Sequence, residues 1–328
     1  MQANQKTHRL RLLFVLLLWV AALLLVFSNQ QRLVDWWKLR GYEPSARIAA
    51  IADRAKMNDL GERLFFVNKP QILEGSTFTQ TCPVGAEKTV VLGCYKGGDN
   101  GIFLSNVQDE RLDGVVEVTA AHEMLHAAYE RLSSGEKERV DGMLQAFYRS
   151  GLNDERIAKT IDSYRQTEPN EIVNEMHSIF ATEVVELPAE LETYYARYFT
   201  DRRAVAEIAA RYQAEFTSRR KAVADYDQEL SVLKQTIETN RARLETERAY
   251  IANLQAELDA LQAAQDIAAY NNLVAPYNQA VRAYNNLLGE TRAHINAYNA
   301  IVAARNAIAL EEQQLVRALS PESLPAQE

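Results

Sequence analysis

The sequence of 328 residues has only two cysteines and five histidines, and its net charge is −8. A general nucleic-acid-binding protein needs a basic surface that neutralises phosphates, so the acidic balance argues against nucleic acid as a partner. The glycine-rich loops that hold phosphates in nucleotide-binding proteins are also missing from the sequence. Because 47% of the residues are hydrophobic, the chain can build a buried core, and its length allows two domains of ordinary size.

One long apolar segment lies near the N-terminus. Residues 12–27, LLFVLLLWVAALLLVF, contain no charged side chain. A bilayer core is crossed by about 20 apolar residues, so this segment is short but sufficient if its flanking residues reach the headgroups. We therefore expect a transmembrane anchor at 12–27 after a cytoplasmic N-terminus of residues 1–11. A cleaved signal peptide is the alternative, although VFSNQQRL at the end of the segment lacks the small-x-small pattern of a cleavage site.

The two cysteines, Cys82 and Cys94, lie in one short region. Such a pair suits a disulfide in an oxidising compartment, whereas unpaired cysteines are often buried in a core. Three basic residues precede the apolar segment and three follow it, so with the α-amino group they favour only slightly an N-terminus inside the cell. Together these features predict a single-pass protein of the cell membrane, with a Cys82–Cys94 disulfide in an extracytoplasmic domain.

The segment VTAAHEMLHAAYERL, residues 118–132, has two of the five histidines four positions apart. On a helix, residues four apart share one face, so His122 and His126 can bind a single metal ion. Glu123 points about 100° away, where it can accept a proton from a water molecule at that ion. The alternative is an ordinary amphipathic helix that happens to contain histidines. Given the His and Glu content of the chain, chance matches to H-E-x-x-H are expected on the order of 0.006 times, so the pattern predicts a metal site.

The HEMLH motif, on a helix that follows the strand-like segment GIFLSNV, resembles the motif of the zincin metallopeptidases. The metzincin extension is absent, because positions 129 and 132 are Tyr and Leu. The chain is more similar to the gluzincin branch, in which a glutamate of a later helix is the third ligand. Two segments, NEIVNE from Asn170 and NEMHS from Asn174, resemble the second gluzincin motif. The resemblance covers roughly residues 60–200 and implies a bound Zn²⁺.

Two glutamates in the segment 170–191 are candidates for the third ligand. This segment contains five glutamates and no Lys or Arg, so a cation would neutralise it. Glu175 lies a turn inside the expected helix, whereas Glu171 falls in the first turn, where the helix dipole favours a carboxylate without a metal. We therefore expect Glu175 to be the ligand, and Glu171 to be an alternative ligand or a residue that orients a ligating histidine. His177 is either a core histidine or a transition-state stabiliser that polarises the substrate carbonyl.

The segment 41–200 combines helical and strand-like patterns. A helix is expected from Ser45, followed by strands at 64–67 and at STFTQTC, TVVLGCY and GIFLSNV, because glycine, proline and aspartate separate these runs. From Asp113, the expected N-cap of the HEMLH helix, to about Phe199 the pattern is helical. The segment from Ser133 to Glu136 resembles a capping box. The predicted fold class is α+β, a zincin-like domain with a small β-sheet and an active-site helix, followed by a long α-helical coiled coil.

The coiled-coil region is expected at 201–318, before a tail of residues 319–328. Between 230 and 261, leucine, isoleucine and two polar residues, Asn240 and Glu247, recur at spacings of three and four, which indicates a heptad seam. Tyr-Asn pairs then recur in a new register, with Pro276 near the break. Two registers predict either two arms folded back as an antiparallel hairpin or one kinked coiled coil that forms a homodimer. The Tyr-Asn repeat is either a surface for a partner protein or coiled-coil packing, which its period of seven favours.

Together the motifs imply a membrane-anchored zinc metallopeptidase that hydrolyses a protein or peptide substrate on the extracytoplasmic side. In the mechanism implied by the resemblance, zinc is held by His122, His126 and Glu175, and Glu123 is the general base. An extended peptide is expected to add to the sheet edge at GIFLSNV. The alternative function is a coiled-coil envelope scaffold whose peptidase-like domain no longer catalyses.

Overall fold

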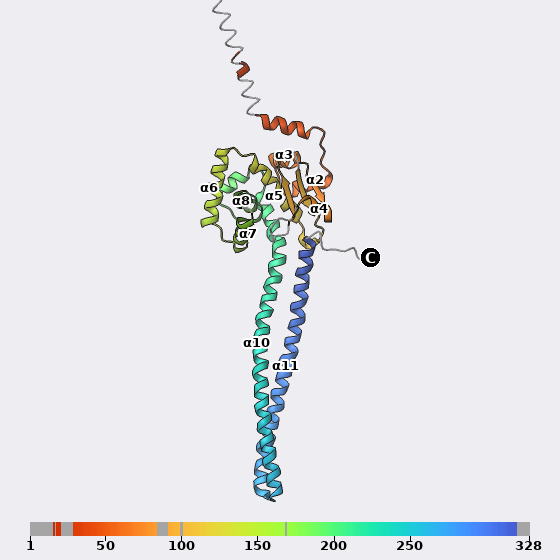
Figure 1. The fold of residues 1–328 in the computed structure, drawn as a ribbon, viewed down its shortest axis with the longest axis vertical. Helices are drawn as coiled ribbons and strands as arrows, with labels where there is room; N and C mark the ends of the chain where they lie inside the picture. The colour runs from red at the N-terminus through yellow and green to blue at the C-terminus, as the bar shows by residue number, and fades with distance from the viewer. Residues whose placement is uncertain are drawn as a thin grey trace, which may run out of the picture. The chain divides into compact units, whose positions relative to one another are not determined.

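The computed structural model describes residues 16, 18–20, 29–83, 91–98, 101–167 and 169–319. This part of the chain is mostly helical, with one three-stranded sheet and a long C-terminal helical region (Figure 1). The chain divides into two compact units, Met1–Tyr212 with Arg317–Glu328, and Gln213–Val316. The division falls after Tyr212 rather than after residue 200, because the first turns of the long helix pack into the first unit.

The predicted transmembrane anchor is wrong. Among the described residues, no helix is both long enough and apolar enough to cross a bilayer. Of residues 12–27 the structure describes Leu16 and residues 18–20, which are helical and exposed. The rest of that segment, like the predicted cytoplasmic N-terminus at 1–11, lies outside the described residues. The uncharged run of 16 residues is shorter than the span of about 20 that a bilayer requires. The finding overturns both the single-pass anchor and the predicted location in the cell membrane.

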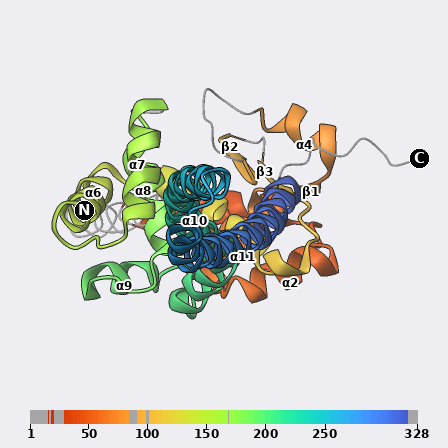
Figure 2. The same cartoon turned by 90° about the horizontal axis from the view of Figure 1, so that it is seen from below.

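The first unit contains short helices around a small sheet. In chain order its elements are α2 (Ala46–Arg54), α3 (Asp59–Val67), β1 (Gln71–Leu73), α4 (Gly75–Thr81), β2 (Gly93–Lys96), β3 (Gly101–Ser105), α5 (Val115–Glu130), α6 (Ser134–Ser150), α7 (Glu155–Thr167), α8 (Ile172–Glu183) and α9 (Ala189–Tyr195). The strand order is β1-β3-β2, with β1 parallel and β2 antiparallel to β3. Figure 2 shows the three strands beside α4.

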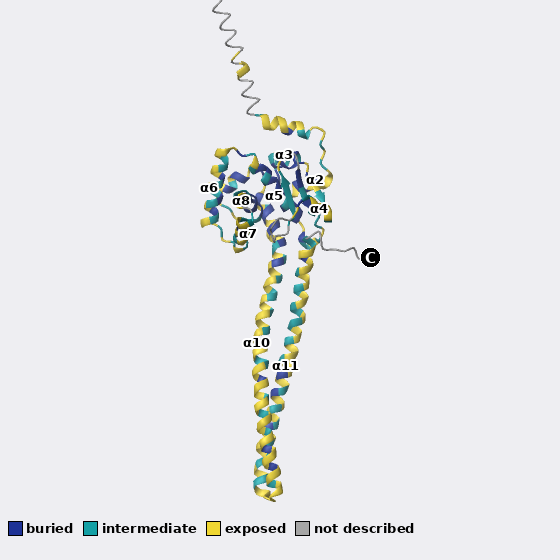
Figure 3. Cartoon of the chain, in the orientation of Figure 1, coloured by how far each residue is buried: buried dark blue, intermediate teal, exposed yellow. Residues whose placement is uncertain are grey.

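Helix α5, which carries HEMLH, is the central element of the first unit. It packs against β2 and β3, against α2 and α3, and against α8. Most of its side chains are buried, including Ala120, Ala121, Ala127 and Ala128, which let neighbouring elements approach closely. Figure 3 shows this buried core where α5 and the sheet meet. A helix buried on most sides holds its polar residues at fixed positions between α8 and β2.

Two segments predicted as strands are helices. Residues 64–67 belong to α3, because the side chain of Asn58 accepts hydrogen bonds from the N–H groups of Leu60 and Gly61 and so starts a helix. STFTQTC forms most of α4, with Phe78 buried. The predicted peptide-binding edge is also wrong: GIFLSNV contains β3, which pairs on both sides, so the edge strands of the sheet are β1 and β2.

The caps of two helices test the boundary predictions. The expected capping box is confirmed, since Ser133 accepts from the N–H of Glu136 and the Glu136 carboxylate accepts from that of Ser133. Asp113 is not the N-cap of α5. That position is Gly114, whose φ of 89° lies in the left-handed region that glycine adopts without strain. Asp113 instead pairs with Arg54.

The helix of residues 29–39 is attached to the first unit through a buried carboxylate. Asp35 is 2% exposed and accepts a hydrogen bond of 3.0 Å from Arg131 Nη1. Arg63 lies on the same oxygen at 3.8 Å. Neighbouring apolar side chains, including Trp36 and Trp37, are exposed. The ion pair, rather than apolar burial, therefore fixes this helix.

Helix α10 (Arg202–Ala263) begins inside the first unit. The side chain of Arg202 is 2% exposed, and its guanidinium donates hydrogen bonds to the carbonyl oxygens of Ala181, Val184 and Val185. It also forms an ion pair with Glu192 at 2.6 Å. Arg202 thus satisfies carbonyl groups at the C-terminal end of α8, which would otherwise lack partners.

The second unit is an antiparallel helical hairpin of α10 and α11 (Ile267–Leu319). The chain reverses near Gln265, whose φ is 58°. Ion pairs of Asp227 with Arg305 and of Arg220 with Glu312 fix the antiparallel register. The kinked single coiled coil is therefore wrong, and Pro276 lies inside α11 rather than at the break. The seam predicted between 230 and 261 faces the partner helix; its most buried members are Asn240, Leu254 and Leu258. The homodimer stays a prediction.

Candidate metal centre

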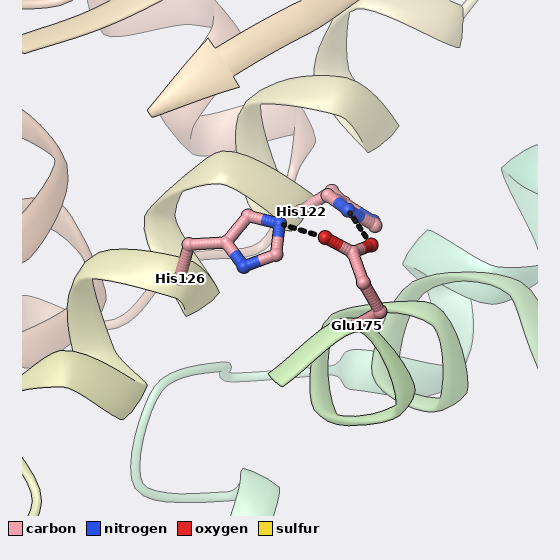
Figure 4. A group of neighbouring side chains, drawn as sticks. All are labelled: His122, His126 and Glu175. Atoms are coloured by element: carbon pink, nitrogen blue, oxygen red, sulfur yellow. Dashed lines mark ion pairs between the residues drawn. The ribbon is translucent and has the colours of Figure 1, made fainter. Parts of the chain in front are cut away.

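Three side chains from α5 and α8 meet at one point. His122 and His126 lie on successive turns of α5, and Glu175 projects from the first turn of α8 toward both imidazoles (Figure 4). Glu175 Oε2 is 3.6 Å from His122 Nε2, and Glu175 Oε1 is 3.5 Å from His126 Nε2. One ligand atom from each residue lies within 4.8 Å of the others, so the group could hold a metal ion.

The separations match what a small tetrahedral ion requires. Zinc binds imidazole nitrogen and carboxylate oxygen at about 2.0–2.2 Å, so two ligand atoms at a tetrahedral angle lie roughly 3.3–3.6 Å apart. The two observed nitrogen–oxygen distances of 3.5 and 3.6 Å fall at the upper end of that range. The side chain of His122 is 18% exposed, which leaves solvent access on one side for a fourth ligand. The donor set of two imidazoles and one carboxylate fits a catalytic zinc site.

The carboxylate of Glu175 is buried, and one of its two oxygens accepts no hydrogen bond. Its Oε2 atom is buried and has no hydrogen-bond partner. Burial raises the pKa of Glu175, but the two imidazoles that face its oxygens lower it, and the pKa lies below its usual value although His122 Nε2, at 3.6 Å from Oε2, is too far for a hydrogen bond. A buried carboxylate with an unpaired oxygen is costly unless a cation neutralises it. Glu175 therefore has the environment expected of a metal ligand.

His126 is oriented by a chain of hydrogen bonds that ends at Glu171. Its Nδ1 lies 3.1 Å from Asn174 Oδ1, and Asn174 Nδ2 donates to Glu171 Oε2 at 3.2 Å. Because a carboxylate only accepts, the amide nitrogen of Asn174 faces Glu171 and its oxygen faces His126. The Nδ1 of His126 then carries the proton, and the lone pair of Nε2 points to Glu175. Glu171 thus contacts Asn174 rather than the candidate metal ligands, and it orients the Asn174 side chain toward His126.

Glu123 lies beside the three residues but on a different face of α5. It is 6% exposed, and its carboxylate accepts a hydrogen bond from the backbone N–H of Tyr95 in β2. Burial raises the pKa of Glu123 to about 7, with the charge of Glu175 acting in the same direction and His126 and the Tyr95 N–H opposing it. A carboxyl with a pKa near neutrality can both accept and return a proton.

His177 does not join this group. It is fully buried, with its Nε2 at 2.9 Å from the Tyr194 hydroxyl, and its ring packs against Tyr129, Tyr194 and Tyr195. Burial lowers the pKa of His177 to about 3, so it is neutral near pH 7. A substrate carbonyl cannot reach a side chain with no exposed surface, so this arrangement favours the core alternative over transition-state stabilisation.

The disulfide between Cys82 and Cys94 is present, as predicted. It joins the end of α4 to β2, one residue from each of Gly93 and Tyr95. Sequence reasoning missed the contributions of Gly93 and Tyr95 to the environment of Glu123, because a glycine and a backbone N–H in a short strand leave no pattern. Asn174 could have been found, since a ligating histidine needs an acceptor for its second nitrogen.

Comparison with known proteins adds no relative: no family model, curated protein or solved structure matches the chain. The argument for function therefore depends on the geometry of the site.

Proposed function

We propose that the protein is a zinc-dependent metallopeptidase whose metal ligands are His122, His126 and Glu175. The observation that carries the proposal is the convergence of two imidazoles and one buried carboxylate, with one ligand atom of each residue within 4.8 Å of the others. A purely structural zinc site usually has four protein ligands, whereas three with solvent access is the arrangement of a hydrolytic site. The gluzincin resemblance of the HEMLH and NEMHS segments supports the same function.

Zinc bound here would act as a Lewis acid toward a peptide carbonyl and lower the pKa of water. Glu123 accepts the proton of the attacking water and passes it to the leaving amine, which a pKa near 7 permits. Asn174 keeps the Nε2 lone pair of His126 directed at the site. The edge strand β2 lies next to Glu123, so an extended substrate would approach along this strand rather than along β3.

The test is zinc content and proteolysis of the purified full chain. Wild type is expected to bind one zinc per chain by elemental analysis and to cleave unfolded casein. Glu123→Gln is expected to keep the zinc and to lower kcat by about 10²–10⁴-fold, because it removes the proton acceptor and no metal ligand. Glu138→Gln, an exposed change on α6 with the same charge difference, is the matched control and should leave both properties unchanged.

A wild-type chain that binds zinc and cleaves none of a panel of unfolded proteins would contradict the proposal. The scaffold function would then be favoured, because the helical hairpin makes up the whole second unit. Binding of a partner protein or a second copy through that hairpin is a separate proposal, tested by sedimentation of the isolated chain.

A further inference from the structure

Strand β2 connects the catalytic helix to the disulfide. It has four residues, pairs with β3 on one side, and contacts α5. Tyr95, in this strand, contacts α5 twice: its backbone N–H donates to the carboxylate of Glu123, and its hydroxyl donates to Glu130 two turns later. The carboxylate of Glu123 is therefore held by the strand and not by solvent.

Gly93 allows this contact. A Cβ atom at position 93 would lie 2.8 Å from Oε1 and 2.9 Å from Cγ of Glu123, and 2.6 Å from Cγ2 of Thr119. All three distances are shorter than real Cβ contacts. Thr119 and Glu123 are one turn apart on α5, so any side chain at 93 would push against the helix at both positions. Glycine is required here by the close approach of strand and helix and not by its backbone angles, since its φ is not positive.

Cys94 holds the same strand covalently. Its disulfide to Cys82 attaches β2 to the end of α4, which in turn packs on β3. Cys82 is 1% exposed, so this attachment point is part of the core. A four-residue edge strand is otherwise held by its ladder on one side alone.

We propose that β2 is a positioning element for the general base: Gly93 admits the Glu123 carboxylate, the Tyr95 N–H fixes its direction, and the Cys82–Cys94 disulfide keeps the strand in place. This inference rests on the proposed function, because it assigns to Glu123 the role of proton acceptor. Neither Gly93 nor Tyr95 is among the three candidate ligands, and both contact Glu123, so their proposed role is to position Glu123. The strand contributes to the rate of the chemical step and not to metal binding.

The first experiment separates the chemical step from metal and substrate binding. In the full chain, Gly93→Ala displaces the Glu123 carboxylate by the overlap at Oε1 and Cγ. Misplacement of a reacting group by about 1 Å costs on the order of 10²-fold in rate, so kcat on casein should fall by about that factor. Zinc content should stay at one per chain, because the ligands are untouched, and kcat should fall by a larger factor than KM rises.

Gly142→Ala is the matched control, because a Cβ there meets nothing within 4 Å and the position is in the exposed part of α6. It should leave kcat, KM and zinc content unchanged. Loss of zinc from Gly93→Ala, or a kcat within twofold of wild type, would refute the positioning role. Cys82→Ala together with Cys94→Ala should lower kcat in the same way with zinc retained, and full activity of this double variant would remove the disulfide from the proposal.

The second experiment does not depend on activity. Hydrogen exchange of the Tyr95 amide, followed by NMR, reports the hydrogen bond to Glu123 directly. Loss of a bond to a charged acceptor should speed this exchange by about 10–100-fold in both Gly93→Ala and Glu123→Ala. If exchange is unchanged in both variants, the bond does not hold the carboxylate and the inference fails. If wild type cleaves nothing while exchange responds as expected, the proposed function fails and the role of the strand in holding Glu123 stands.

Discussion

Removal of Glu175 should weaken zinc binding far more than removal of Glu171. Structural zinc sites with four ligands bind with about 10–16 kcal/mol, or roughly 2.5–4 kcal/mol for each ligand. Glu175→Ala removes the only carboxylate of the group and should therefore raise the zinc Kd by about 10²–10³-fold. Asn174→Ala leaves every ligand in place but frees the Nδ1 of His126, and loss of such an orienting contact costs about 10–100-fold. Glu171→Ala is one hydrogen bond further away and should cost less than tenfold.

The assay is a competition titration against a chromophoric zinc chelator at constant pH. Glu138→Ala, an exposed change on α6, corrects for the loss of one negative charge from the chain. We expect the zinc Kd to be highest for Glu175→Ala, lower for Asn174→Ala and lower again for Glu171→Ala. The Kd of the control should equal that of wild type. If Glu171→Ala weakens binding as much as Glu175→Ala, Glu171 is a ligand in solution and the third ligand assigned from the structure is incorrect.

Three further predictions concern stability. Replacing Cys82 and Cys94 with alanine should lower the free energy of unfolding of the first unit by about 3 kcal/mol, from the loop entropy of a 12-residue separation; a urea titration that shows no loss would contradict this. Asp35→Ala should cost about 1–3 kcal/mol by removing a buried ion-pair partner, while the exposed Asp53→Ala should cost almost nothing in the same titration. Asn240→Leu should raise the melting temperature of the hairpin, followed by circular dichroism, since Asn240 is 8% exposed in an apolar seam; a lower melting temperature would disprove the assigned seam.

The parts of the site that follow from helical spacing could be predicted from the sequence. His122 and His126 share a face because they are four residues apart, and the acidic segment 170–191, which lacks basic residues, indicated a nearby cation. The reason given for preferring Glu175 to Glu171 was wrong, because Glu171 is the N-cap of α8 and Glu175 lies in its first turn. The seam of the hairpin followed in the same way from its spacing of three and four. In each case the relevant contacts are one helical turn apart, so periodicity encodes them.

Other features depend on contacts between distant segments, which periodicity does not encode. STFTQTC has the composition of a strand, yet it folds as α4, where Phe78 is buried against the sheet. The orientation of His126 by Asn174 joins residues 48 positions apart. Gly93 is required only because α5 passes close to β2. The N-terminal apolar run has the composition of a membrane span, but its 16 uncharged residues are fewer than the roughly 20 that a bilayer requires.

The hydrogen bonds of Arg202 determine where the first unit can be separated from the second. Domain shuffling and limited proteolysis usually separate two units at the junction between them, which for this chain is residue 201 by composition. Such a cut would delete the guanidinium that closes the end of α8. The carbonyl groups left without partners would destabilise the C-terminal end of α8. Glu175 lies in the first turn of the same helix. The smallest fragment expected to fold as the first unit therefore includes the first turns of α10.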